Sequence, residues 1–66
     1  MHVTAEVVGR GTRELDLAAD ATYADLLHAL ELNTHEATVL VEGTPVPEDG
    51  SIDTAQVQVL RLIKGG

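Results

Sequence analysis

The chain has 66 residues and a formal net charge of −7, because 11 acidic residues face only four basic ones. So few Lys and Arg residues exclude direct nucleic-acid binding through phosphate contacts, and the absence of cysteine excludes disulfides and thiolate zinc sites. We expect a single-domain, soluble, cytoplasmic monomer with no membrane span, because no apolar run approaches the roughly 20 residues that a spanning helix needs.

The first half of the chain predicts a β-hairpin followed by one helix. Residues 2–8 and 13–17 alternate apolar and polar side chains, which is typical of half-buried strands, and a glycine-bearing turn of hairpin length joins them. Thr22 and Asp25 have the spacing of a capping box, so a helix should begin there and end near residue 31 or 32. Its apolar stripe consists of Tyr23, Leu26, Leu27 and Leu30.

The second half predicts further strands. Residues 37–42 form a β-rich run in which Val39 and Val41 share one face and Leu40 lies on the other. A short edge strand is expected to begin at Val46, because the prolines on either side of it cannot donate ladder hydrogen bonds. Residues 48–51 read as a turn whose acidic side chains are solvated.

The final strand is expected over residues 56–63, with Val57 and Val59 on one face and Leu60 and Leu62 on the other. Because the first and last strands carry strong apolar runs, they should lie side by side at the centre of the sheet. This arrangement is a two-layer α+β domain, a mixed four- to five-stranded sheet with the helix on one face. The expected core consists of Val3, Val7, Leu15, Leu17, Tyr23, Leu26, Leu30, Val39, Val41, Val57 and Val59.

The sequence offers no catalytic or metal-binding constellation. His2, His28 and His35 lack the spacing of a metal site, so no metal is expected. Glu48 and Asp49 are adjacent loop acids without an apolar pocket, which argues against a general acid–base pair. We therefore expect neither catalytic residues nor a cofactor.

The order of elements resembles the β-grasp, or ubiquitin-like, fold over the whole chain. The ending VQVLRLIKGG is similar to the tail of ubiquitin in its apolar alternation, its basic residue and its glycine pair. The stretches TYADLLHAL, TVLVEGTPVPED and VLRLIKGG resemble the small archaeal modifier proteins of haloarchaea, most closely the type that is both a protein modifier and a sulfur carrier for tRNA thiolation. The acid-rich, lysine-poor composition is also similar to that of proteins from salt-loving organisms. The sulfur carriers of thiamin and molybdopterin synthesis share the fold and the tail.

The resemblance implies a ubiquitin-like domain over residues 1–63 and a flexible tail over residues 64–66. A ubiquitin-activating-type enzyme would adenylate the carboxylate of Gly66. The activated carbonyl would then become a thiocarboxylate for the tRNA thiolation machinery, or would be joined to target-protein lysines by an isopeptide bond. On this interpretation the chain is a substrate of enzymes and not itself an enzyme.

Further residues of the last strand and the tail are candidates for partner contact. Leu40, Leu60 and Leu62 should lie on the sheet face opposite the helix, which in the ubiquitin fold is the partner-binding face. Arg61 and Lys64 make the tail locally positive and could guide it into an acidic or nucleotide-bearing channel. Gly65 supplies the backbone freedom needed to thread a narrow channel.

Two alternative functions remain open at this point. The chain could be a passive ubiquitin-fold interaction module whose glycines are a loose end. It could instead resemble the small subunit of molybdopterin synthase, whose thiocarboxylate works inside the active site of a partner.

Overall fold

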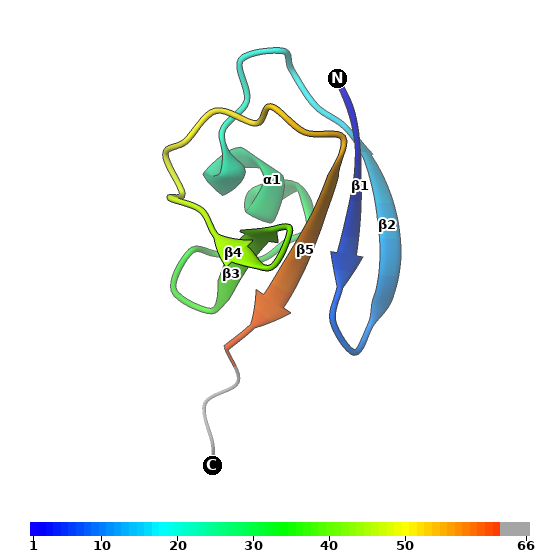
Figure 1. Ribbon diagram of the computed structural model, residues 1–66, viewed down its shortest axis with the longest axis vertical. Coiled ribbons are helices and arrows are strands. Elements are labelled where there is room, and N and C mark those ends of the chain that lie inside the picture. Colours follow the sequence, from blue (N-terminus) through cyan, green and yellow to red (C-terminus); the bar gives the residue numbers. More distant parts are fainter. Residues whose placement is uncertain (63–66) are drawn as a thin grey trace.

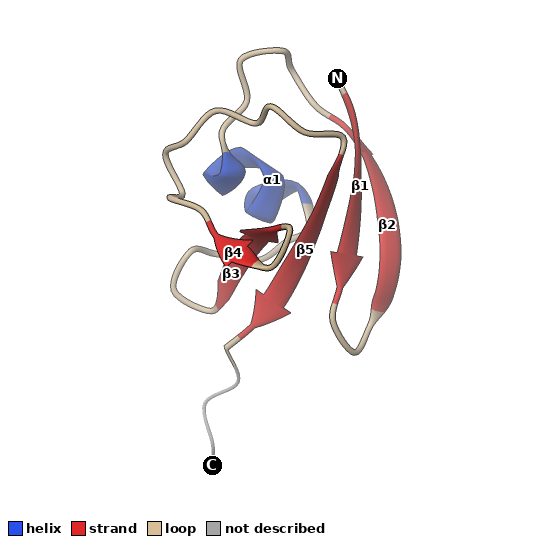
Figure 2. Ribbon diagram, in the orientation of Figure 1, coloured by secondary structure: helices blue, strands red, loops and turns tan. Residues whose placement is uncertain are grey.

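The computed structural model describes residues 1–62 of the chain, and residues 63–66 lie outside the described part. Within residues 1–62 a mixed sheet and one helix form two layers, with the helix against one face of the sheet (Figures 1 and 2), which confirms the expected α+β architecture. The elements are β1 His2–Val7, β2 Gly11–Asp16, α1 Tyr23–Ala29, β3 Ala37–Val41, β4 Thr44–Pro45 and β5 Gln56–Arg61.

The first and last strands lie at the centre of the sheet, as the sequence predicts. The strand order is β2-β1-β5-β3-β4, and β1 and β5 are parallel. All other pairs are antiparallel, and Val59 of β5 lies opposite both Val7 of β1 and Val39 of β3. The backbone N–H of Val8 donates to the carbonyl of Val59 at 2.9 Å, which continues this pairing beyond β1. Both sides of β5 are therefore hydrogen-bonded.

The hydrophobic core lies between the sheet and α1. Val57 and Val59 are buried while Leu60 is exposed, which confirms the expected register of β5. The prediction was too strong for Leu15, Leu17 and Val41, which are only partly buried. Leu15 lies on the edge strand β2, Leu17 follows that strand, and Val41 ends β3 next to a turn. The buried residues are Val3, Ala5, Val7, Ala21, Tyr23, Leu26, Leu27, Leu30, Ala37, Val39, Ile52, Val57 and Val59.

The turns correct several strand boundaries. Glu42 and Gly43 both have positive φ angles, 53° and 80°, and Val41 pairs with Thr44 across them. Two consecutive residues with positive φ form the type I′ turn that matches the twist of a hairpin. The edge strand therefore begins at Thr44 and not at Val46, and β3 ends at Val41 and not at residue 42.

The N-terminus of α1 is fully capped, which explains why so short a helix forms here. Thr22 Oγ1 accepts a hydrogen bond from the Asp25 N–H at 3.3 Å, and Asp25 Oδ2 accepts one from the Thr22 N–H at 3.0 Å, which confirms the predicted capping box. The N–H groups of Tyr23 and Ala24 donate to carbonyls of the 48–50 turn at 3.1 and 2.8 Å. The first backbone donors of the helix, which have no partners inside it, are thus satisfied.

The C-terminus of α1 ends in a strained residue. The helix stops at Ala29, earlier than expected, and Glu31 has a φ of 63°. The N–H of Leu32 donates to the Leu27 carbonyl and the N–H of Glu31 donates to the His28 carbonyl, both at 2.9 Å. This pair of bonds is a Schellman motif, in which glycine normally occupies the position that Glu31 holds.

Replacement of Glu31 by glycine should therefore stabilise the fold. Removing the Cβ that disfavours the left-handed conformation should raise the free energy of unfolding by about 0.5–1 kcal/mol, after the entropy of glycine in the unfolded chain is deducted. Urea denaturation of Glu31→Gly measures this change. Glu31→Ala is the control, because it removes the charge but keeps the Cβ; an equal gain in both variants would show that the charge, and not the backbone, is responsible.

Tyr23 anchors the start of the helix in the core. Burial raises the pKa of its phenol above the ordinary 10.0, the carboxylate of Asp53 raises it further, and a hydrogen bond with the Asp53 backbone lowers it. A raised pKa means that the folded state favours the neutral phenol. The stability that Tyr23 contributes through this pKa is fully present below pH 10 and is lost as the pH rises through the folded-state pKa.

Titration of Tyr23 should show this shift directly. It is the only tyrosine and there is no tryptophan, so the near-ultraviolet absorbance of the phenolate reports one residue. The midpoint in the folded protein should lie above the midpoint in concentrated urea. Tyr23→Phe should show a smaller loss of stability between neutral pH and pH values above 10 than the wild-type chain. Coincident midpoints in the folded and unfolded protein would contradict the assigned environment.

Candidate functional site

The candidate site lies where β5 ends, at the same end of the molecule as the β1–β2 turn (Figure 1). Thr38 pairs with Leu60, and Ala37 pairs with Arg61. The N–H of Leu62 donates to the Glu36 carbonyl at 2.7 Å, so the backbone is held for one residue beyond the strand. The predicted tail residues Lys64, Gly65 and Gly66 lie outside the described residues.

The predicted leucine face is present only in part. Leu60 is 39% exposed and lies on the sheet face opposite α1, and Leu62, after the strand, is 49% exposed. Leu40 shares the face of Leu60 but is half-buried, and it lies diagonally across from Leu60 because its direct partner is Gln58. Diagonal neighbours on paired strands are about 7–8 Å apart, within reach of leucine side chains. Leu40 and Leu60 therefore form a small apolar contact area in a polar surface.

The surface around Leu40 is a shallow groove whose lining mixes polar and apolar groups. The groove has a volume of about 410 Å³, and side chains of β1 and β5 line it together with Leu40. Its polar lining includes Thr4, Glu6 and Gln58. A partner that docks on this face would contact hydrogen-bonding groups as well as the leucines.

Arg61 does not belong to the leucine face. Its strand partner Ala37 is buried, so Arg61 lies on the helix side of the sheet, while Leu40 and Leu60 lie on the opposite side. The helix has only seven residues and leaves this end of the sheet uncovered. A hollow of about 420 Å³ lies there, which we call the three-arginine pocket because Arg10, Arg13 and Arg61 line it.

Sequence reasoning missed Arg10 and Arg13 as site residues. Arg13 pairs with the buried Ala5 and Gly11 pairs with the buried Val7, so positions 11 and 13 of β2 face the helix side. The signal was available in the alternation of β2, which puts Arg13 on the same face as Leu15. Recognising the pocket also requires the position at which the helix ends, and no local pattern supplies that position.

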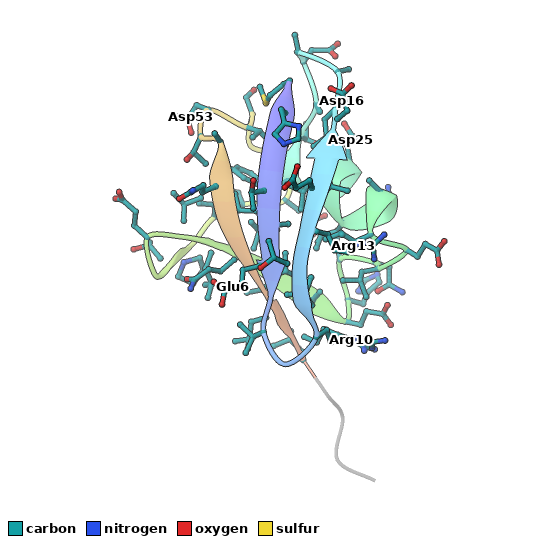
Figure 3. All side chains as sticks on the ribbon, turned by 90° about the vertical axis from the view of Figure 1, so that its right-hand side faces the viewer. Glu6, Arg10, Arg13, Asp16, Asp25 and Asp53 are labelled. Carbon is teal, nitrogen blue, oxygen red and sulfur yellow. The ribbon has the colours of Figure 1, made fainter. Side chains whose placement is uncertain are left out.

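The charge distribution of the molecule is uneven. The pocket contains three of the four basic residues of the chain, and Glu31 and Glu36 also line it. Figure 3 shows Arg10 near the end of β5 and Arg13 about halfway along β2 on the helix side, whereas Asp16, Asp25 and Asp53 lie towards the other end and Glu6 lies towards the end of β5. Within residues 1–62 the Met1 amine pairs with Asp16 at 3.6 Å and His2 Nε2 lies 3.1 Å from Glu14 Oε1, and neither contact involves an arginine.

The described part of the chain holds few other candidate sites. Among residues 1–62 no group of three or more His, Cys, Asp or Glu side chains is placed to hold a metal ion. No helix within those residues has the length and apolar character to span a membrane. The end of β5, with its leucine face and the three-arginine pocket, is therefore the site that the geometry favours.

Substitution of Leu40 and Leu60 should show whether these side chains belong to the surface or to the core. The double variant Leu40→Ala/Leu60→Ala should lower the free energy of unfolding by about 1 kcal/mol or less, because both side chains keep contact with solvent. Leu26→Ala is the matched control, since Leu26 is 0% exposed and its truncation should cost about 2–5 kcal/mol. Urea denaturation measures both, and equal losses would show that Leu40 and Leu60 are core residues.

Known proteins resemble this chain over its full length. The family model of small archaeal modifier protein 2 matches residues 1–63. Small archaeal modifier protein 2 of Haloferax volcanii is 59% identical over 66 residues, with all of both chains covered, and an uncharacterised protein of Archaeoglobus fulgidus is 28% identical over 67 residues, again with full coverage.

A solved structure agrees with the sequence comparisons. The crystal structure of the Haloferax volcanii small archaeal modifier protein 2 has a TM-score of 0.75 at 58% identity, and 97% of each chain is covered. The mixed sheet with one helix on it is thus the arrangement of a crystallised modifier, compatible with the expected β-grasp fold. The chain belongs to the small archaeal modifier protein 2 family, whose members are ubiquitin-like modifiers.

Proposed function

We propose that this chain is a protein modifier and sulfur carrier whose working group is the carboxylate of Gly66. A ubiquitin-activating-type enzyme in the cytoplasm adenylates that carboxylate. The product then becomes a thiocarboxylate for the tRNA thiolation machinery or an isopeptide bond with a target-protein lysine. Membership of a modifier family, with a glycine pair a few residues after the central strand in the sequence, is the observation that carries the proposal.

The position of β5 supports this role. Because β1 and β3 hold β5 on both sides, and the Leu62 N–H is bonded to Glu36, the chain leaves the sheet from a fixed point. Four residues follow Leu62 in the sequence, and four residues in extended conformation span at most about 13–14 Å. That length would carry the carboxylate of Gly66 from the sheet into the active site of a partner.

The chemistry requires activation by ATP. A carboxylate is a poor electrophile, because attack on it must expel an oxide. When an oxygen of the Gly66 carboxylate attacks the α-phosphorus of ATP, pyrophosphate leaves and a mixed anhydride with AMP forms. A sulfide nucleophile or a lysine amine then attacks the carbonyl carbon and displaces AMP, which gives a thiocarboxylate or an amide. Glycine suits both products because it has no Cβ to shield the carbonyl carbon.

The described surfaces would serve recognition. Leu40, Leu60 and Leu62 would dock on the activating enzyme, and Arg61 with Lys64 would guide the tail towards its channel. Docking through a few partly exposed leucines suits a transient complex, which an enzyme substrate needs for release. All the chemistry in this proposal belongs to the partners, and the chain contributes the reacting carboxylate.

Changes at the terminus should abolish activation without affecting the fold. Deletion of Gly66, and addition of one residue after it, should both eliminate ATP–pyrophosphate exchange with the cognate activating enzyme, because the carboxylate is then displaced. Gly66→Ala should reduce exchange less severely, since a methyl group crowds the carbonyl. Thermal melts of the three variants should match the wild-type melt, because the buried core ends at Val59 within the described residues.

A wild-type rate of exchange by the Gly66 deletion would overturn the proposal. The chain would then be a passive interaction module. If the wild-type chain instead copurifies stably with a large synthase subunit and works only inside it, the molybdopterin synthase alternative would replace the proposal.

A further inference from the structure

We propose that the three-arginine pocket binds a carboxylate side chain of the protein that receives the C-terminus, and that this contact orients the modifier on its partner. The inference rests on the proposed function, because it takes the partner to be the enzyme that acts on Gly66. It adds Arg10 and Arg13, on the helix side of the sheet, to a recognition surface otherwise confined to the leucine face and the tail.

The hydrogen-bonding capacity of the pocket is not used within residues 1–62. None of its three guanidinium groups takes part in an ion pair there. The Nε atom of Arg61 is buried and has no hydrogen-bond partner among the described residues. A buried donor without a partner is unfavourable, and a guanidinium offers its donors in a planar fork that matches a carboxylate. An incoming carboxylate would satisfy these donors.

The pocket follows from how the strands and the helix end. The alternation that puts Leu15 and Val59 into the core puts Arg13 and Arg61 at the next position on the same face. Apolar side chains at those positions would lie exposed, because α1 stops at Ala29. Gly11, also on the lining, carries no side chain and leaves space between the hairpin and the helix end. Arg13 and Arg61, which lie on the helix side of the sheet, therefore face a hollow and not a packed layer of side chains.

The charges of the pocket favour a single carboxylate over a phosphate chain. Three guanidinium groups together with Glu31 and Glu36 leave one net positive charge, which suits a monoanion. A polyanion such as RNA would also meet the repulsion of a molecule with a net charge of −7.

The place of the pocket fits the same partner. Arg61 is the last residue of β5, so the pocket opens beside the point at which the chain leaves the sheet. Arg10 lies at that end of the molecule and Arg13 lies farther along β2 on the helix side (Figure 3). A protein that draws the tail into its active site therefore lies within reach of the pocket, and an acidic residue next to its tail channel would complete the contact.

Arg13 provides the sharpest test, because it is exposed and its side chain makes no ion pair within residues 1–62. In ATP–pyrophosphate exchange with the activating enzyme of the same organism, Arg13→Gln should raise the half-saturating concentration of the modifier about tenfold. Arg13→Lys keeps the positive charge but loses the planar set of guanidinium donors, so it should give an intermediate rise in the half-saturating concentration. The matched control is Ser51→Asp, an equal change in net charge at an exposed residue near the start of the helix, which should leave the concentration unchanged.

A direct binding measurement tests the carboxylate site independently of the proposed function. In ¹⁵N spectra of the full chain, hexaglutamate should shift the Nε–H signals of Arg13 and Arg61 in a saturable way, and hexauridylate at equal ionic strength should shift them much less. Stronger shifts with hexauridylate, or no shifts with either probe, would overturn the carboxylate site.

The exchange assay tests the orienting role separately. An unchanged half-saturating concentration for Arg13→Gln would overturn the orienting role, while exchange by the wild-type chain would still support the proposed function. If the wild-type chain is not activated at all, the proposed function fails, the orienting role fails with it, and the spectra alone decide whether the pocket binds carboxylates.

Discussion

The parallel pairing of β1 with β5 is the contact on which the rest of the structure depends. It joins the two ends of the chain, and its buried residues Ala5, Val7, Val57 and Val59 form the floor of the core. Since β2 is attached only to β1, and β3 only to β5 and β4, the sheet exists only when this central pair forms. Parallel strands need a long connection, and here the connection includes the second hairpin strand, the helix and the short edge strand. The last strand is held on both edges, by β1 and by β3, and the point at which it ends is set by the fold itself.

The second constraint is the shortness of the helix. Its N-terminus is bonded by its own capping box and by carbonyls of the 48–50 turn, so its position along the sheet is determined at that end. Its seven residues cover only part of the sheet, and they stop at a strained Glu31. The uncovered part of the helix side holds the three-arginine pocket, while the opposite face holds Leu40 and Leu60. Two chemically different surfaces therefore flank the end of β5, and a partner that binds there can recognise orientation as well as position.

Much of this fold was predictable, because it follows from local sequence patterns. Alternation defined four of the strands and the faces of Val57 and Leu60, and the spacing of Thr22 and Asp25 marked the start of the helix. The expectation that the two strongly apolar strands pair at the centre of the sheet was also correct, because the side chains of a central strand pack against those of the strands on both sides. These features depend on residues close together in sequence or on overall hydrophobicity.

The features that escaped prediction depend on tertiary context. A left-handed Glu42 before Gly43 moved the edge strand forward to Thr44, and nothing in a glutamate signals that conformation. Ile52, in a loop, joins the core because the 48–50 turn docks on the helix N-terminus. Arg13 could be assigned to the helix side from alternation, but its place in a pocket depends on where α1 ends. The position of the candidate residues on β5 was thus predictable, and that of the residues on the neighbouring hairpin was not.

The central claim is that the fold presents the carboxylate of Gly66 as a reacting group. The most direct measurement is the chemical state of the C-terminus of this protein isolated from its own cells, determined by mass spectrometry. The account predicts a fraction with sulfur in place of oxygen at the terminal carboxylate, or peptides in which Gly66 is joined to a lysine of another protein. A terminus found only as the free carboxylate, in cells in which the activating enzyme is present and active, would contradict it.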